Sequence, residues 1–146
     1  MCSARLQPVL DALKKMKELG VWVEVTTLVV PDMNDSEAEL HDIAGFIAGE
    51  LGVETPWHVS RFHPDYKMYD RAATPQATLR RAYDLGREAG LRYVYVGNMP
   101  GARLEDTTCP ACGQRVIGRW GFQVTQRNTQ DGKCTFCGAT IDGVGL

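Results

Sequence analysis

The first hundred residues alternate between apolar positions at helical spacing and short runs of β-branched and aromatic residues. Three segments have apolar residues three to four positions apart, which is the pattern of an amphipathic helix. We expect one helix over residues 4–19 that ends at Gly20. A second is expected to start at a capping box formed by Ser36 and Glu39 and to end at Gly52. A third is expected to be capped by Thr74-Pro75 and to end at Gly90.

The segments between these helices have the composition of strands. Residues 21–30 form a nearly continuous β-rich run, which predicts a strand buried on both faces, as in a parallel sheet. Shorter strands are expected over residues 57–62 and 92–96. Because each strand is followed or preceded by a helix at regular intervals, the pattern is that of successive βα units. The fold class is therefore α/β, with a parallel sheet or part of a barrel.

The last forty or so residues have a different character, because they contain two cysteine pairs. Cys109, Cys112, Cys134 and Cys137 have the spacing C-x2-C-x21-C-x2-C, and a glycine follows each pair. Such a pair places both sulfurs in one tight turn, and the glycine supplies the positive φ that closes it. Two turns joined by a hairpin over residues 115–124 would bring four thiolates into a tetrahedron. This pattern predicts a structural metal site, most simply zinc.

Two other interpretations of the cysteines remain. The same residues would form two disulfides in a small secreted module, but no signal peptide precedes them and paired turns favour a metal. Iron in a rubredoxin-like site uses the same turns as zinc. A closed four-cysteine site has no open coordination position, so we expect a structural role. The fifth cysteine, Cys2, is interpreted as a free thiol.

Composition narrows the classes of partner. The chain has 146 residues, a formal net charge of -2, 44% hydrophobic residues and 23% charged residues, which are ordinary values for a soluble globular protein. This charge argues against a general nucleic-acid or membrane-surface role. No apolar run approaches the ~20 residues that span a bilayer. We therefore expect a cytoplasmic protein without a membrane partner.

Chemistry outside the cysteines is concentrated after the second strand. In parallel βα folds, ligands bind at the carboxyl ends of the strands. Residues 61–67 follow the second strand and include Arg61, His63 and Asp65, which suit an anion or a proton-transfer role as well as a solvated loop. His58 is interpreted as an ordinary strand histidine. The sequence contains no Ser-His-Asp order, phosphate-binding glycine loop or H-E-x-x-H motif.

Four stretches, taken in order, resemble the C-terminal half of a radical SAM enzyme. They are residues 29–36 (VVPDMNDS), 57–68 (WHVSRFHPDYKM), 91–98 (LRYVYVGN) and the two cysteine pairs. The sequence is most similar to the group related to pyruvate formate-lyase activating enzyme, specifically the AmmeMemoRadiSam-system radical SAM protein. The resemblance covers essentially the whole chain.

The resemblance implies a partial (β/α)6 barrel that this chain enters at the fourth helix and follows through the fifth and sixth βα units. Residues 1–101 would be the barrel segment, and residues 102–146 a zinc-ribbon-like module. The family cleaves S-adenosylmethionine reductively with a 4Fe-4S cluster and so generates a 5′-deoxyadenosyl radical. By alignment with relatives, Leu28 would supply an apolar contact to the adenosyl group, and Ser60 and His63 would contact adenine.

This sequence departs from the family pattern in ways that limit the activity of the chain alone. The cluster motif C-x3-C-x2-C is absent, and the family often has glycine at the position of Asp32. We therefore expect the enzyme's C-terminal portion, inactive alone, with S-adenosylmethionine and a protein substrate as partners of the intact enzyme. The alternative is a zinc-stabilised module that binds protein or, less plausibly given the charge, nucleic acid. Arg115, Arg119, Lys133 and Trp120 would form its surface.

Overall fold

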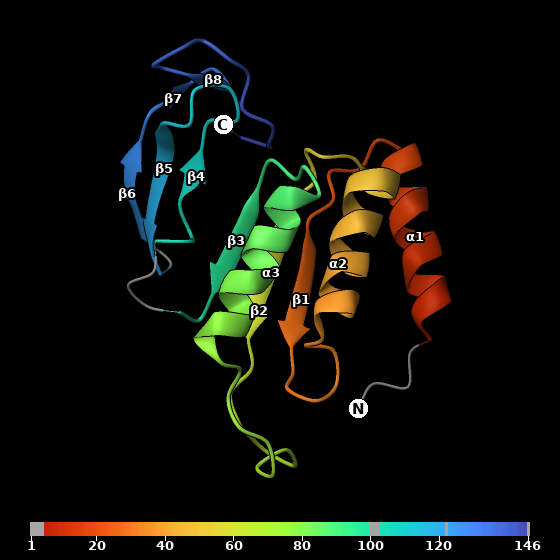
Figure 1. Ribbon diagram of the computed structural model, residues 1–146. Helices are drawn as coiled ribbons and strands as arrows, with labels where there is room; N and C mark the ends of the chain where they lie inside the picture. Colours follow the sequence, from red (N-terminus) through yellow and green to blue (C-terminus); the bar gives the residue numbers. More distant parts are fainter. Residues whose placement is uncertain (1–4, 100–102, 122, 146) are drawn as a thin grey trace.

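The computed structural model describes residues 5–99, 103–121 and 123–145 (Figure 1). Helices and parallel strands alternate in the first part: α1 (Leu6–Glu18), β1 (Val25–Val29), α2 (Glu37–Phe46), the π-helical turn η1 (Ile47–Leu51), β2 (Trp57–Arg61), α3 (Gln76–Glu88) and β3 (Val94–Gly97). Short antiparallel strands follow: β4 (Thr107–Thr108), β5 (Arg115–Trp120), β6 (Gln123–Arg127), β7 (Thr129–Gln130) and β8 (Lys133–Cys134). Cys2 and the expected boundary at residue 101 lie outside the described residues.

The first three strands form one parallel sheet in the order β1-β2-β3. Trp57 of β2 is in register with Val25 on one side and with Val94 on the other. The three predicted helices and the parallel sheet are therefore confirmed. The mixed α/β class follows from the alternation of helical and strand patterns along the chain.

One face of this sheet is buried by helices α2 and α3, which lie in front of it in Figure 1. Trp57 and Val59 of β2 are fully buried there, and the indole N–H of Trp57 donates to Thr27 Oγ1 at 2.9 Å. Helix α3 approaches closely because Gly86 has no side chain. A Cβ at Gly86 would lie 2.8 Å from Val94 Cγ2 and 2.9 Å from Trp57 Cε3. The core of the α/β part therefore lies between the sheet and these two helices.

Among the described residues, no helix covers the opposite face of the sheet, so the expectation of a strand buried on both faces is wrong for β1. Its residues alternate in burial, with Val29 buried and with Thr26 and Leu28 exposed. The run of β-branched residues concealed this alternation, since Thr and Val have similar strand propensity but different polarity. The strand also begins at Val25 rather than at residue 21.

Helix α1 forms as predicted but packs loosely. None of its residues is buried, and Leu13 is its contact with the main core. Ion pairs also hold it beside η1, with Lys14 Nζ 2.7 Å from Glu50 and Lys17 Nζ 2.9 Å from Glu54. Its other apolar residues, with two that follow it, face solvent: Leu6, Val9, Met16, Leu19 and Val21. Much of the apolar stripe that predicted this helix therefore lacks a partner among the described residues.

The two expected helix caps have different outcomes. Ser36 caps α2 as predicted: its Oγ accepts a hydrogen bond from the N–H of Glu39 and donates to Glu39 Oε2. Thr74 does not cap α3, whose N-cap is Pro75 without a side-chain hydrogen bond. Instead, buried Thr74 Oγ1 donates to the carbonyl of Val29 at 2.6 Å and accepts from the N–H of Phe62 at 2.9 Å. Thr74 thus links the end of β1 to the residue after β2 through hydrogen bonds.

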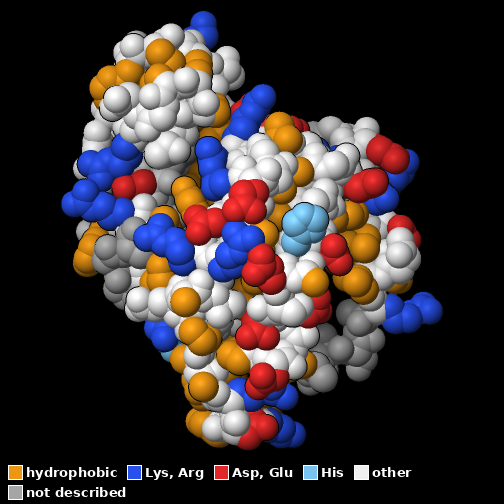
Figure 2. Space-filling model, viewed as in Figure 1, with side chains coloured by type: hydrophobic (Ala, Val, Ile, Leu, Met, Phe, Trp, Pro, Cys, Tyr) orange, Lys and Arg blue, Asp and Glu red, His pale blue; other side chains and the backbone are white. Residues whose placement is uncertain are grey.

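The outer surface of the helices is charged. Figure 2 shows acidic and basic side chains interspersed over this side of the molecule. Arg81 of α3 lies 2.6 Å from Glu37 and 2.9 Å from Glu88, and its hydrogen bond lowers the pKa of the Glu37 carboxyl. Such exposed pairs contribute little to stability. This side therefore has the character of an ordinary solvated surface.

We expect Thr74→Val to destabilise the fold by about 1–3 kcal/mol, because it leaves a buried carbonyl and a buried N–H without their partner. Urea unfolding measures the change. Thr26→Val is the matched control, since Thr26 is exposed on a strand and has no side-chain hydrogen bond among the described residues. We expect that control to stay within about 0.5 kcal/mol of the parent. Equal effects of the two substitutions would contradict the role given to Thr74.

Asp32 adopts the left-handed conformation, with φ of 61°. A side chain there costs free energy that glycine avoids. We expect Asp32→Gly to preserve or raise stability, by up to about 1 kcal/mol, and Asp32→Val to lower it by about 1–2 kcal/mol. Thermal unfolding of both variants measures this. A valine variant as stable as the glycine variant would show that the turn does not need positive φ.

Candidate metal centre

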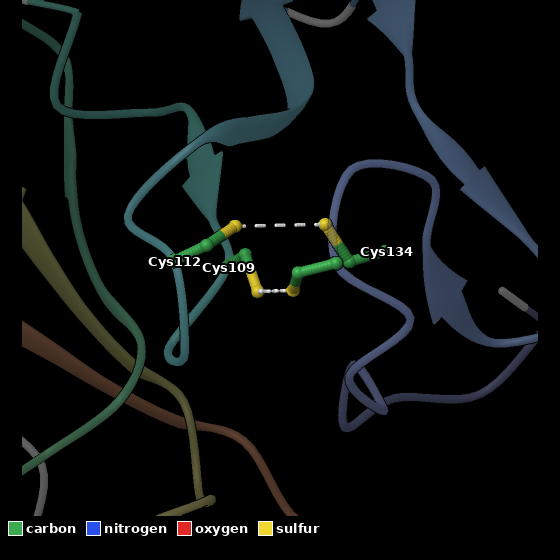
Figure 3. Close-up of side chains that lie close together, drawn as sticks. Cys109, Cys112 and Cys134 are labelled. Atoms are coloured by element: carbon green, nitrogen blue, oxygen red, sulfur yellow. Dashed lines mark hydrogen bonds between the residues drawn. The ribbon is translucent and has the colours of Figure 1, made fainter.

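The four predicted cysteines come together in the C-terminal part of the chain (Figure 3). Their sulfur atoms all lie within 4.8 Å of one another. Cys109 Sγ is 3.6 Å from Cys137 Sγ, and Cys112 Sγ is 3.8 Å from Cys134 Sγ. These separations exceed a disulfide bond of about 2.05 Å. They match the separation of about 3.8 Å between thiolates that surround one ion tetrahedrally at about 2.3 Å.

Each cysteine pair lies in a tight turn that a glycine closes. The N–H of Gly113 donates to the carbonyl of Cys109 at 2.9 Å, and the N–H of Gly138 donates to that of Cys134 at 2.8 Å. Both glycines have positive φ, 71° and 76°, as the sequence predicted. A side chain at either position would strain the turn. The glycines therefore fix the direction in which the sulfurs point.

The predicted hairpin joins the two turns. Strands β5 and β6 pair antiparallel, with Ile117 opposite Arg127. The first cysteine of each pair is buried in a small cluster with Tyr93, Val116, Ile117 and Ile141, whereas the second is exposed. This core is small, so a bound ion would supply much of its folding free energy. We call residues 103–145 the ribbon.

The ionisation of the thiols suits a cation. Burial raises the pKa of Cys109, but hydrogen bonds from the backbone N–H groups of Cys112 and Ala111 outweigh it and lower the pKa to about 7. At Cys137 the N–H of Ala139 favours the thiolate, but the neighbouring sulfurs, Cys112 foremost, raise the pKa to about 12. Thiolates this close repel one another. A divalent cation would remove that repulsion and deprotonate all four.

The ribbon is attached to the sheet through β3 and the residue before it. The hydroxyl of Tyr93 donates to Asp142 Oδ2 and accepts from the N–H of Asp142, both at 3.0 Å. Arg92 Nη1 lies 2.9 Å from the same carboxylate. Burial raises the pKa of Tyr93, so its hydroxyl remains a donor at neutral pH. The end of the ribbon is therefore fixed against the end of the sheet.

A cavity of about 870 Å³ lies between the helix-free face of the sheet and the ribbon. Alternate residues of the strands form its floor, among them Thr26, His58, Ser60, Tyr95 and Gly97. Residues that flank the strands also line it: Trp22, Glu24, Pro56, Asn98 and Met99. The ribbon contributes Glu105, Thr107, Ile117, Arg119, Trp120, Gly121, Ile141, Asp142, Gly143 and Val144.

The structure brings two of the three expected cofactor-binding residues together. Leu28 and Ser60 are register partners on β1 and β2, on the helix-free face, and Ser60 lines the cavity. Leu28 is 48% exposed. His63 is exposed in the loop after β2 and does not line the cavity. An adenosyl group across β1 and β2 could therefore contact Leu28 and Ser60, while His63 would have to approach from the loop.

Four polar residues of the cavity were not predicted to lie together: Glu24, His58, Tyr95 and Arg119. The position of His58 could have been inferred from the sequence. The apolar residues on either side of it, Trp57 and Val59, belong to the buried face of the strand, so His58 belongs to the other face. Glu24 lay in a run interpreted as continuous strand. Arg119 comes from the ribbon, so its proximity depends on tertiary structure.

Comparisons with known proteins give a relative but no family. No family model matches the chain. The chain is 48% identical over 144 residues to the uncharacterized protein MJ0808 of Methanocaldococcus jannaschii. The match covers 97% of this chain and 43% of that relative. The chain therefore spans less than half the length of the curated protein that it matches.

No helix in the described part of the chain has both the length and the apolar character needed to cross a bilayer.

We expect the purified chain to bind about one zinc ion, and Cys137→Ser to reduce the metal content at least tenfold, because a closed site needs all four ligands. Cys2→Ser is the matched control, since Cys2 lies outside the two pairs. Affinity should fall as the pH drops below about 12, where protons begin to compete for Cys137, and should fall more steeply below about 7, where they also compete for Cys109. Elemental analysis and competition with a chelator measure both effects. Unchanged metal in Cys137→Ser would contradict the assignment.

Proposed function

We propose that this chain is the C-terminal portion of a radical SAM enzyme that generates a 5′-deoxyadenosyl radical from S-adenosylmethionine. The observation that carries the proposal is the three-stranded parallel sheet with helices on one face and a polar cavity on the other. A barrel wall has this construction, because helices cover its outside and ligands approach its inside.

The edge of the sheet supports an incomplete barrel. Strand β1 is the first in the order β1-β2-β3 and pairs only with β2 among the described residues. Helix α1, which packs beside η1, exposes an apolar stripe. An unpaired edge and an uncovered helix are both liabilities for an isolated domain. A further strand paired with β1 would remove the first, and a further segment packed on α1 would remove the second.

Within this proposal, Leu28 and Ser60 contact the adenosyl group at the carboxyl ends of β1 and β2, and His63 reaches it from the loop. Residues 1–101 are the barrel segment and residues 102–146 the zinc-ribbon-like module, whose described part is the ribbon. We assign zinc to the four cysteines, because the site is closed and thiolate-only. Its role is structural, so the radical chemistry does not pass through it.

The chain does not provide the ligands of a catalytic cluster. Apart from the four cysteines of the ribbon, its sequence has one cysteine, Cys2, and no C-x3-C-x2-C motif. When bound, a 4Fe-4S cluster supplies the electron that cleaves S-adenosylmethionine. This chain would position the adenosyl group and exclude water, and the cluster would have to be held by another segment or polypeptide.

The alternative, a zinc-stabilised module that binds protein or nucleic acid, has less support. Two of its expected basic residues are already engaged within the ribbon. Arg119 donates to the carbonyl of Glu105 and to Thr107 Oγ1, and Arg115 pairs with Asp106 at 3.3 Å. Lys133 and Trp120 remain exposed. They do not make up the basic, aromatic groove that single-stranded nucleic acid requires.

An anaerobic cleavage assay tests the proposal. After reconstitution with iron and sulfide, and with a chemical reductant, we expect this chain to form no 5′-deoxyadenosine from S-adenosylmethionine. We expect the longer M. jannaschii relative, treated identically, to form 5′-deoxyadenosine and methionine in equal amounts. Chromatography of both products measures the outcome. Cleavage by this chain alone, or the lack of cleavage by the longer relative, would falsify the proposal.

A substitution in the longer relative locates the adenosyl contact. Tyrosine at the position aligned with Ser60 should reduce cleavage at least tenfold, because its ring would occupy the space beside the strand. A phenylalanine at the position aligned with His41, which is exposed on α2 on the other side of the sheet, is the control. Equal activity of the two variants would place the adenosyl group elsewhere.

A further inference from the structure

A row of mostly exposed or half-buried side chains runs along the cavity from the sheet to the ribbon. Glu24 Oε2 lies 2.8 Å from His58 Nε2, and Glu24 Oε1 accepts a hydrogen bond from Trp22 Nε1 at 3.0 Å. The His58 ring stacks on Tyr95 with centroids 5.0 Å apart. Glu24 is thus held on both oxygens, and it fixes the orientation of the imidazole.

Residues of the ribbon contact the other end of this row. The Arg119 guanidinium lies 5.4 Å from the centre of the Tyr95 ring. Arg119 Nη1 donates to Thr107 Oγ1 at 2.7 Å and to the carbonyl of Glu105 at 3.0 Å, and the Tyr95 hydroxyl is 2.9 Å from Thr107 Oγ1. Six side chains therefore form one connected network: Trp22, Glu24, His58, Tyr95, Arg119 and Thr107.

Other polar groups of the cavity have no partner. Within the described residues, the hydroxyls of Thr26 and Ser60 make no hydrogen bond, and His58 Nδ1 makes none either. Trp120 also lines the cavity but is 63% exposed, the aromatic side chain of the lining that faces solvent most. Free acceptors beside an exposed aromatic ring are typical of a ligand site.

We propose that the part of the cavity between the Glu24–His58 pair and Trp120 binds a planar heteroaromatic group that donates an N–H hydrogen bond to His58. The proposal does not depend on the radical chemistry, because it concerns binding to this chain without a cluster or S-adenosylmethionine.

The lining of the cavity favours a flat ligand. On the sheet side, the small residues Thr26, Ser60 and Gly97 lie beside the stacked rings of His58 and Tyr95. On the ribbon side, Trp120 presents a further aromatic ring. A cavity of about 870 Å³ falls within the range of small-molecule sites. Aromatic rings on both sides favour a ring that can stack on them over an extended or branched group.

The hydrogen-bonding pattern favours a ligand that donates. In neutral His58 the Glu24 carboxylate takes the Nε2–H, which leaves Nδ1 as an acceptor. The carboxylate itself also accepts. The main donor of the cavity, Arg119, directs Nη1 to Thr107 and Glu105. A ring N–H next to His58 would therefore find an acceptor, whereas a methylated nitrogen would find none and would add bulk.

Two purine analogues that differ at one nitrogen test this. Theophylline has a ring N–H that caffeine carries as N–CH₃, and the rings are otherwise the same. In an NMR titration of the full chain with bound zinc, we expect theophylline to bind saturably and to shift the ring signals of His58. Caffeine should bind at least tenfold more weakly, because it leaves His58 Nδ1 unpaired.

Two variants assign the effect to residues. His58→Phe keeps a ring beside Tyr95 but removes the acceptor, so it should lower theophylline affinity to the level of caffeine. Trp120→Ala removes the exposed ring and should weaken both compounds about fivefold or more. The matched controls are His41→Phe on α2 and Val124→Ala, an exposed residue of the same hairpin outside the cavity. Both controls should bind like the parent.

Three results would overturn the proposal: equal affinity for the two compounds, no saturable binding of either up to its solubility limit, or unchanged binding in Trp120→Ala. The last variant changes an exposed residue, so its folding is not at risk. Loss of S-adenosylmethionine cleavage in the longer relative would leave this result untouched, and the two proposals therefore fail separately.

Discussion

In the part of the chain that the structure describes, helices pack on only one face of the parallel sheet, and this one-sided burial is the constraint on which the rest of the structure depends. On the helical side, α2 and α3 pack over Trp57, Val59 and Val29. The other side carries hydroxyls, an imidazole and a phenol, which a hydrocarbon core would not accept without partners. The ribbon lies over this side of the sheet but does not fill the space next to it. The cavity is the space left between a polar sheet face and a small domain that cannot pack tightly against it.

The ribbon in turn depends on its four sulfur atoms. Its apolar cluster consists of few side chains around Cys109 and Cys134, too few to stabilise strands as short as β4, β7 and β8. An ion held by the four thiolates would replace the missing core and fix the hairpin that carries Arg119 and Trp120. The metal centre would therefore support the hairpin that forms one wall of the cavity. The hydrogen bond between Tyr93 and Asp142 joins the ribbon to the sheet next to β3.

Local sequence signals predicted much of this fold. The cysteine spacing predicted the cluster, the helical stripes predicted three helices, and Ser36 predicted the cap of α2. The errors arose where the outcome depended on distant contacts. Thr74 stands where a cap is usual, but its hydroxyl meets Val29 and Phe62, which lie 45 and 12 residues away in the sequence. Exposure of one face of β1 could not be foreseen from a run of Val and Thr, because these residues suit both buried and exposed strands. The row from Glu24 to Arg119 joins residues that only tertiary folding brings together.

The contact between Gly86 and Trp57 has a consequence for how such a chain can evolve. Helix α3 reaches the sheet only because position 86 lacks a Cβ, and the space is occupied by the side chains of Val94 and Trp57. A larger residue at position 86 therefore requires smaller ones at both of these positions, since a close-packed interior leaves no other room for it. Homologous chains should vary at these three positions together, with smaller residues at positions 57 and 94 wherever position 86 carries a side chain. That covariation would persist even where the cavity on the far side of the sheet has changed its ligand.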